Sequence, residues 1–200
     1  SGMPARGGSA ISATMPAEAM KTTWLLLVLA TLGFAAPARN EAALLRSMPA
    51  ETLDWIVRGG WPDEHGLVGY NRPGWRHVTF QRSAAWALGI AAARGDRARA
   101  DQAWHAVEVA FEHQVAAGNF AFVEFGERPF RTGDDVSGVS LWMASLCHAL
   151  LVIRESPLDD AYAERIAALL PQIRKATDWL AAHCGVLERY DQKAPNRLFF

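Results

Sequence analysis

Cysteine is scarce in this chain of 200 residues, which contains only Cys147 and Cys184. An exported protein could join the two in a disulfide. The helical pattern described below instead places them on two antiparallel helices, at heights that differ by roughly 25 Å at ~1.5 Å per residue. A disulfide requires Cα atoms within about 7 Å. We therefore expect two free thiols, with Cys147 filling part of a core.

An excess of charge of one sign is also lacking, because the formal net charge is −1 at pH 7. This balance argues against a nucleic-acid partner. The sequence has neither a Gly-rich phosphate loop nor the nucleophile elbow of many hydrolases, and we predict no cofactor. His105, Glu108 and Glu112 could share a helix face, but no second cluster supports a metal site there. We predict a solvated polar face and no metal.

The longest apolar run, residues 24–36, has 13 residues, whereas a membrane-spanning helix needs roughly 20. Lys21 precedes this run, and Ala36-Pro37-Ala38 follows it. The layout is typical of a signal peptide over residues 20–38, cleaved after Ala38; the alternative is an uncleaved anchor or a buried helix. We thus expect a periplasmic or secreted protein with no stable membrane span after cleavage.

The remaining sequence divides into two parts. Residues 1–19 are rich in Gly, Ala, Ser and Pro, and we interpret them as disordered or as sequence upstream of a start at Met20. Residues 39–200 are enough for one domain with its own core. The chain begins with Ser and ends in two Phe, so we expect a fragment cut at both ends.

Strand signals are nearly absent, and only FAFVEF at residues 120–125 alternates. Helical periodicity dominates, and the predicted fold class is all-α. We expect a sixth helix to begin at Asn196, and Pro49 and Pro171 mark points where helices can break. The other predicted helices cover residues 41–58, 79–94, 97–117, 137–155 and 157–183.

Short and long connections alternate between these helices. Gly95-Asp96 and Ser156-Pro157 form the short ones, while residues 59–78, 118–136 and 185–195 form the long ones. Helices that follow the long connections begin 58 and 59 residues apart. This spacing indicates a repeat of antiparallel helix pairs, which cannot bury their apolar faces alone. If helices alternate in direction, the long connections meet at one end, where binding residues are common.

The long connections combine aromatic rings with Arg, His and Asn, a combination that suits an anionic sugar. Rings offer stacking surfaces, Arg pairs with carboxylates, and Tyr or His can move a proton. Several of these residues also have a structural alternative: for His77 it is a hydrogen-bonded core residue, for Asn196 a helix cap, and for Arg72 or Arg76 a partner of loop carboxylates. The candidate catalytic residues are Tyr70, His77 and Asn196, and the candidate substrate-binding residues are Trp61, Arg72, Trp75, Arg76, Arg131 and Arg197.

The segment AAWALGIAAARGDRARADQAWHAVEVAFEHQ joins two Ala-rich helices through a Gly-Asp turn. Residues 79–200 resemble the α/α-toroid (six-hairpin) carbohydrate enzymes, which implies antiparallel helical hairpins forming part of an incomplete toroid. Within that group, KAPNRLFF is similar to the place where alginate-lyase-like and heparinase-like polysaccharide lyases carry an Asn, usually followed by Asn or His. The resemblance implies that Asn196 neutralises a uronate carboxylate. Arg197 stands where His is expected, and the family's catalytic Tyr is expected beyond residue 200.

The favoured hypothesis is an exported enzyme that cleaves a uronic-acid polysaccharide by β-elimination. A second hypothesis keeps the fold but makes the chain a glycoside hydrolase that uses two carboxylates from Glu124, Asp134 and Asp135. Asp134 and Asp135 could equally complement a helix N-terminus. A third hypothesis is a non-catalytic glycan-binding domain. All three share a polysaccharide or oligosaccharide as partner.

Overall fold

The computed structural model describes residues 40–123 and 132–188, with the side chains of 132–134 and 187–188 left out. The predicted signal peptide, the 1–19 segment and the sixth helix at Asn196 lie outside these residues. In the described part of the chain there is no strand, and the all-α prediction is confirmed. Residues 120–123 contribute only an isolated bridge between Gln114 and Phe120, so the strand expected there is not formed.

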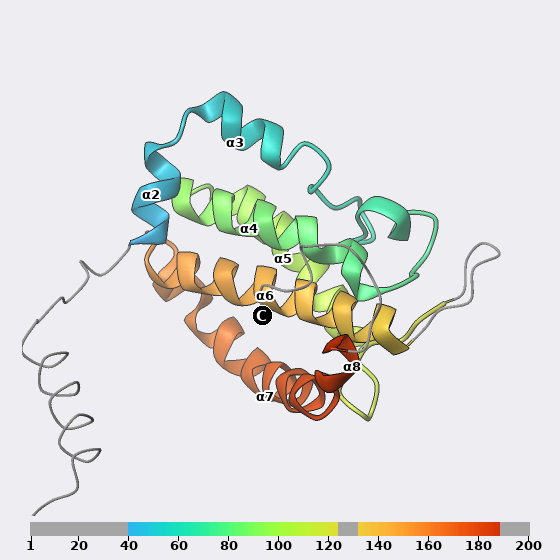
Figure 1. Ribbon diagram of the computed structural model, residues 1–200. Coiled ribbons are helices and arrows are strands. Elements are labelled where there is room, and N and C mark those ends of the chain that lie inside the picture. Colours follow the sequence, from blue (N-terminus) through green and yellow to red (C-terminus); the bar gives the residue numbers. More distant parts are fainter. Residues whose placement is uncertain (1–39, 124–131, 189–200) are drawn as a thin grey trace, which may run out of the picture. The chain divides into compact units, whose positions relative to one another are not determined.

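Helices and short 3₁₀ turns make up the described fold (Figure 1). In chain order they are α2 (Glu41–Ser47), α3 (Ala50–Ile56), η1 (Gly69–Asn71), η2 (Val78–Gln81), α4 (Arg82–Arg94), α5 (Arg97–Glu112), α6 (Thr132–Arg154), α7 (Asp159–His183) and α8 (Gly185–Glu188).

Of the two prolines predicted to break a helix, one does so. Pro49 separates α2 from α3, since Met48 is extended and Pro49 caps the second helix. Pro171 does not split α7, which runs through it as one helix of 25 residues. Gly95 ends α4 in a left-handed conformation, with φ 70°, and its N–H bonds to the carbonyls of Ala91 and Ala92.

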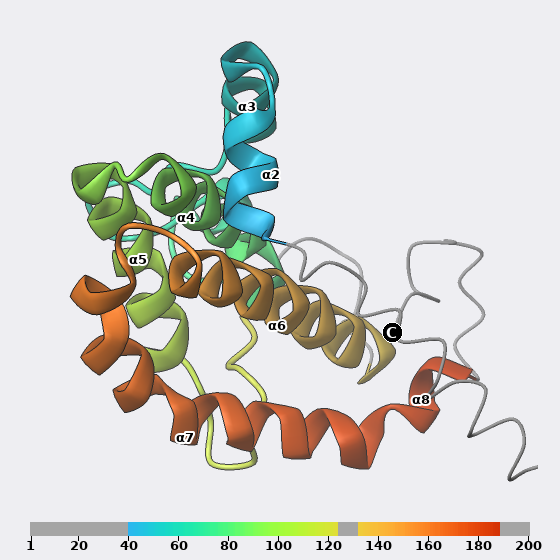
Figure 2. The same cartoon turned by 90° about the vertical axis from the view of Figure 1, so that its left-hand side faces the viewer.

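α4 is the central helix of this fold. It packs against α5, α6 and α2 (Figures 1 and 2). Small residues allow the close approach: a Cβ placed on Gly89 would lie 3.6 Å from the Cα of Ala149 on α6. α4 is consequently buried along most of its length, with six buried alanines. α7 packs on α6 and, through the side-chain contacts below, on α5.

A polar network joins α5 to α7. The Asp101 carboxylate accepts hydrogen bonds from the Tyr162 hydroxyl (2.8 Å) and from Arg165 (2.6 Å). Arg97 bonds to its other oxygen at 3.0 Å. Burial alone would raise the pKa of Asp101, but these donors outweigh it and hold the pKa below its ordinary value. Burial and the bond to Asp101 raise the pKa of Tyr162.

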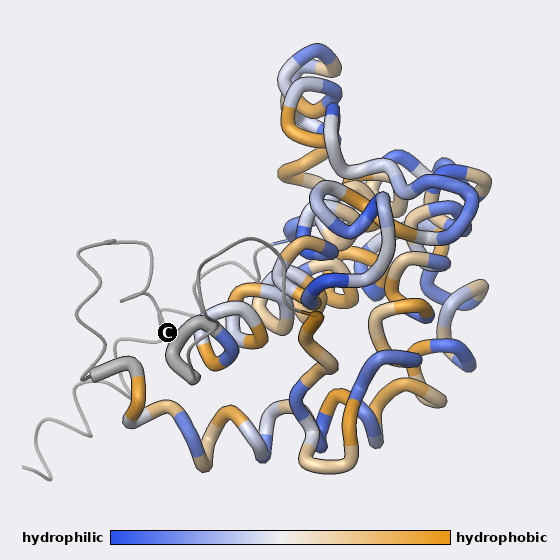
Figure 3. The backbone as a smooth tube through the Cα atoms, turned by 90° about the vertical axis from the view of Figure 1, so that its right-hand side faces the viewer, coloured by the Kyte–Doolittle hydropathy of each residue, from blue (hydrophilic) through white to orange (hydrophobic). Residues whose placement is uncertain are grey.

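The short connections lie together at one end of the helices. A Cβ on Gly95, in the turn between α4 and α5, would lie 3.8 Å from Pro157, in the turn between α6 and α7. The N–H of Ala42 on α2 also bonds to the Glu155 carboxylate at this end, at 3.3 Å. By contrast, the long connection that precedes α4 is mostly hydrophilic (Figure 3).

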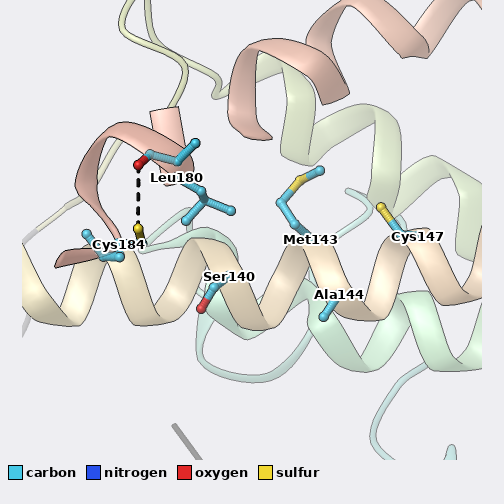
Figure 4. A pocket seen from close by; sticks show the side chains of 8 residues that line it. Ser140, Met143, Ala144, Cys147, Leu180 and Cys184 are labelled. Atoms are coloured by element: carbon cyan, nitrogen blue, oxygen red, sulfur yellow. Dashed lines mark hydrogen bonds between the residues drawn. The ribbon is translucent and has the colours of Figure 1, made fainter. Parts of the chain in front are cut away.

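An apolar groove of about 310 Å³ lies between α6 and α7 (Figure 4). Cys147 and Cys184 stand at its two ends, with Met143 and Leu180 among the residues between them. Both thiols are free, as predicted, and Cys147 packs against the main core. The hydroxyl of Ser140 bonds to the Ser137 carbonyl, so it is already satisfied within α6.

α6 is the most apolar of the described helices. By length and composition alone, its stretch Asp135–Arg154 is the one helix in the described residues that could cross a membrane. Inside the fold, however, 67% of that stretch is buried, which is the behaviour of a core helix.

Candidate functional site

The first two long connections meet at the end of the helices opposite the short turns. The N–H of Val123 donates to the Arg76 carbonyl at 2.9 Å. The indole N–H of Trp75 donates to the Ala121 carbonyl at 2.8 Å. Two segments separated by more than 40 residues are therefore joined directly, as the alternation of short and long connections predicts.

Trp75 also stacks on His113, at the end of α5, with ring centroids 4.0 Å apart and planes 15° from parallel. Burial lowers the pKa of His113, although Glu112 opposes the effect. His113 therefore covers one face of the Trp75 indole, which was predicted to bind substrate.

A buried pair of side chains joins the first connection to α6. Nε2 of His77 lies 3.1 Å from Oδ1 of Asp135, and the His77 residue is 1% exposed. Oδ2 of Asp135 accepts a hydrogen bond from the Asn119 amide at 2.8 Å. Both carboxylate oxygens of Asp135 thus have partners from different segments. Gly138 makes room for the imidazole, because a Cβ there would overlap the ring.

Residues 70–77 form a segment with two buried side chains, while the others are exposed or half-buried. Asn71 and His77 are buried, whereas Tyr70 is 71% exposed and Arg72 is also exposed. Trp75 and Arg76 are half-buried. Tyr70 lies edge-on to Phe80, with ring centroids 5.3 Å apart. The phenol of Tyr70 and the side chain of Arg72 therefore lie at the surface.

Trp61 is held by two arginines. The guanidinium of Arg99, on α5, lies 4.8 Å from the centre of its ring. Nη2 of Arg72 donates to the Trp61 carbonyl at 3.3 Å. Arg72 thus has a backbone partner within the first long connection, and the pairing of an arginine with loop carboxylates stays a prediction.

The structure brings together part of the predicted set. His77 and Asp135 are in contact, and Trp75 and Arg76 belong to the segments that join the two connections. The burial of His77 corresponds to its structural alternative, and a catalytic role for it stays a prediction. Glu124, Arg131, Asn196 and Arg197 lie outside the described residues, as does the side chain of Asp134.

Sequence analysis missed three residues that organise this end. Asn71 and Gln81 are fully buried amides, and Asn119 holds Asp135. Asn71 stands between two exposed residues and Gln81 directly precedes a helix, so neither position carries a pattern that distinguishes a core amide from a surface one. Among the described residues, no group of three or more His, Cys, Asp or Glu side chains is placed to hold a metal ion.

We compared the chain with models of known protein families, with curated proteins and with solved structures, and none of them matched. The functional argument therefore depends on the residues themselves.

Proposed function

We propose that this chain belongs to an exported carbohydrate-active enzyme that cleaves a uronic-acid polysaccharide by β-elimination. One observation carries the proposal: residues 70–77 fold around buried Asn71 and His77 so that a tyrosine and an arginine are exposed in one short segment. Half-buried Trp75 and Arg76 complete the segment. Phenol, guanidinium and indole groups are the ones that a negatively charged sugar needs.

Each group has a role in the proposed reaction. Arg72 and Arg76 pair with the uronate carboxylate, which stabilises the negative charge that develops when the C5 proton leaves. Tyr70 transfers the proton. The electrons of the C5–H bond form the C4–C5 double bond, the C4–O bond breaks, and the leaving oxygen accepts a proton. His77, buried against Asp135, holds the two connections together beneath the substrate.

We also propose that the helices belong to an incomplete α/α toroid. Two features support this: α4 is joined to α5, and α6 to α7, by short turns that lie together, while the first two long connections meet at the other end. A toroid of helical hairpins requires both.

The test exposes the full chain, expressed for export, to alginate, glycosaminoglycans and pectin-like polymers. A lyase produces unsaturated sugar ends that absorb ultraviolet light, so a rise in absorbance on one polymer is the expected result. Tyr70→Phe and Arg72→Ala should each lower the rate by about 10²-fold or more, the usual range for a lost proton donor or charge partner. Arg154→Ala is the matched control, because Arg154 pairs with Asp159 near the opposite end.

The other outcomes distinguish the alternatives. New reducing ends without absorbance indicate hydrolysis and assign the chemistry to Asp135 with Glu124 or Asp134. Binding of a polymer without either product indicates a glycan-binding domain. Full activity of Tyr70→Phe and Arg72→Ala on a cleaved polymer would remove residues 70–77 from the site.

A further inference from the structure

Two buried amides fix the backbone of the segment that carries the candidate site. Asn71 is 0% exposed, and its Oδ1 accepts hydrogen bonds from the N–H groups of Arg76 (2.8 Å) and His77 (3.1 Å). Its Nδ2 donates to the His77 carbonyl (3.0 Å) and to Oε1 of Gln81 (3.2 Å). One side chain therefore bonds to both backbone polar groups of His77 and to the N–H of Arg76.

Gln81 connects this arrangement to the helices. It is also 0% exposed, and its Oε1 accepts a second bond from the N–H of Val68 at 3.0 Å. Its Nε2 donates to the carbonyl of Gly66 (2.8 Å) and to that of Ala106 on α5 (3.3 Å). Every polar atom of the two amides is thus used, and the network extends from α5 to residue 77.

The bonds to Asn71 replace those that a helix or strand would provide. Residues 72–77 belong to neither, so the N–H groups of Arg76 and His77 depend on this amide instead. A buried N–H without an acceptor is strongly disfavoured. The Asn71 amide therefore determines which way the backbone faces at Arg76, and with it the side from which the guanidinium leaves the chain.

We propose that Asn71, anchored to α5 by Gln81, is a positioning residue that presets Arg76 for a carboxylate ligand. This inference rests on the proposed function for the identity of the ligand. A segment ordered in advance loses less conformational freedom when the ligand binds. Loss of the amide therefore weakens binding of the acidic sugar more than it slows any subsequent chemical step.

The experiment measures amide hydrogen exchange and ligand binding on the same variants. In Asn71→Ala, exchange at Arg76 and His77 accelerates by at least about tenfold, whereas amides in α4 and α5 keep their rates. Gln114→Ala is the matched control, because Gln114 bonds to Gly118 and Gln172 and not to residues 70–77.

Binding is followed by titration with galacturonate oligomers. The dissociation constant rises by about tenfold in Asn71→Ala. On any polymer that the protein cleaves, KM rises similarly while kcat changes by less than about threefold. Exchange that accelerates equally at all sites, or unchanged binding in Asn71→Ala, overturns the proposal.

The proposal can still be tested if Asn71→Ala does not fold or if no polymer is cleaved. If Asn71→Ala does not fold, Gln81→Glu keeps the acceptor for Val68 and Asn71 but removes the donors to Gly66 and Ala106. Faster exchange at Arg76 and His77 in that variant supports the proposal, and unchanged exchange overturns it. If no polymer is cleaved, the proposed β-elimination is wrong. Oligomer binding and amide exchange at Arg76 and His77 still test the role of Asn71 in that case.

Discussion

Gly138 on α6 lies directly against the ring of His77. A Cβ at this position would overlap the imidazole, lying 2.9 Å from its Nδ1, and would stand 3.1 Å from the Cβ of Thr79. The ring has little freedom to move, since Asn71 binds its backbone and Asp135 lies 3.1 Å from Nε2. A glycine is therefore required here for space, within a helix where alanine would otherwise be preferred.

We predict that Gly138→Ala lowers the free energy of unfolding by about 1–3 kcal/mol, the usual cost of an overpacked core. Urea denaturation followed by circular dichroism measures the effect. Gly59→Ala is the control, because nothing lies within 4 Å of a Cβ at Gly59 and its stability should change little. A neutral or stabilising Gly138→Ala would show that the His77 ring can move aside.

The two cysteines differ in their surroundings although both line the same groove. Cys184 is exposed, while Cys147 is half-buried and burial raises the pKa of its thiol. The thiolate is the reactive form of cysteine, so the raised pKa and the reduced access both make Cys147 less reactive than Cys184.

We predict that iodoacetamide at pH 8 alkylates Cys184 several-fold faster than Cys147. Peptide mass spectrometry over a time course gives both rates in one sample. Unfolding in urea should make the two rates similar, which separates the effect of the fold from that of local sequence. Equal rates in the folded protein would contradict the placement of Cys147 against the core.

At the scale of elements, Asp101 is the main polar link between α5 and α7. It accepts bonds from Tyr162, Arg165 and Arg97, and its pKa lies below the ordinary value. The ionised carboxylate is thus favoured in the folded state. A lowered carboxyl pKa adds stability above the pKa of the unfolded chain, about 3.9 for Asp, and this stability is lost as the pH falls through the folded value.

We predict that Asp101→Asn lowers the free energy of unfolding by about 1 kcal/mol at pH 7, because the carboxylate is partly exposed and solvent weakens its pairs. The difference from the unchanged protein should begin to shrink below about pH 4, where Asp101 of the unfolded chain takes up a proton, and should disappear below the lower pKa of the folded state. Thermal unfolding at a series of pH values tests this. A difference that stays constant down to pH 3 would show that the charge of Asp101 is not what joins the helices.

The sequence predicts helices well where periodicity and caps agree, and less well elsewhere. Gly95 and Asp96 mark the α4–α5 turn correctly, since a left-handed glycine followed by a side-chain cap is a local signal. α6 begins at Thr132, five residues before the predicted start at 137. Pro171 leaves α7 unbroken, because packing against α6 offsets the lost hydrogen bond.

The candidate site was less predictable than the fold. Residues 59–78 were correctly expected to meet the second connection, because alternation of helix direction follows from connection length. The burial of His77 matches the structural alternative that its sequence left open. The roles of Asn71, Gln81 and Asn119 were not predictable, since they depend on partners 10 to 25 residues away in sequence. Single polar residues in a loop carry no periodicity that reveals such partners.

At the scale of the whole molecule, the proposal of export can be tested through the N-terminal residues. The proposed signal peptide ends at Ala38, and the described fold begins just afterwards, at Asn40. We predict that protein expressed with an intact export system is recovered from the periplasm or the medium without residues 1–38. Intact mass and N-terminal sequencing measure this, and Ala38→Arg, which blocks the cleavage site, is the control. Recovery of a full-length chain in the cytoplasm would refute export.

The central position of α4 also has a consequence for the order in which the chain folds. Its contacts with α5 join residues close in sequence and can form early, whereas those with α6, such as the bond from Trp86 to Ser145, join residues 59 positions apart and form later. Until α6 packs against it, one side of the alanine-rich helix α4 remains exposed to water. A chain interrupted during translocation or synthesis before α6 would thus expose its centre, so capture by chaperones should peak at that length.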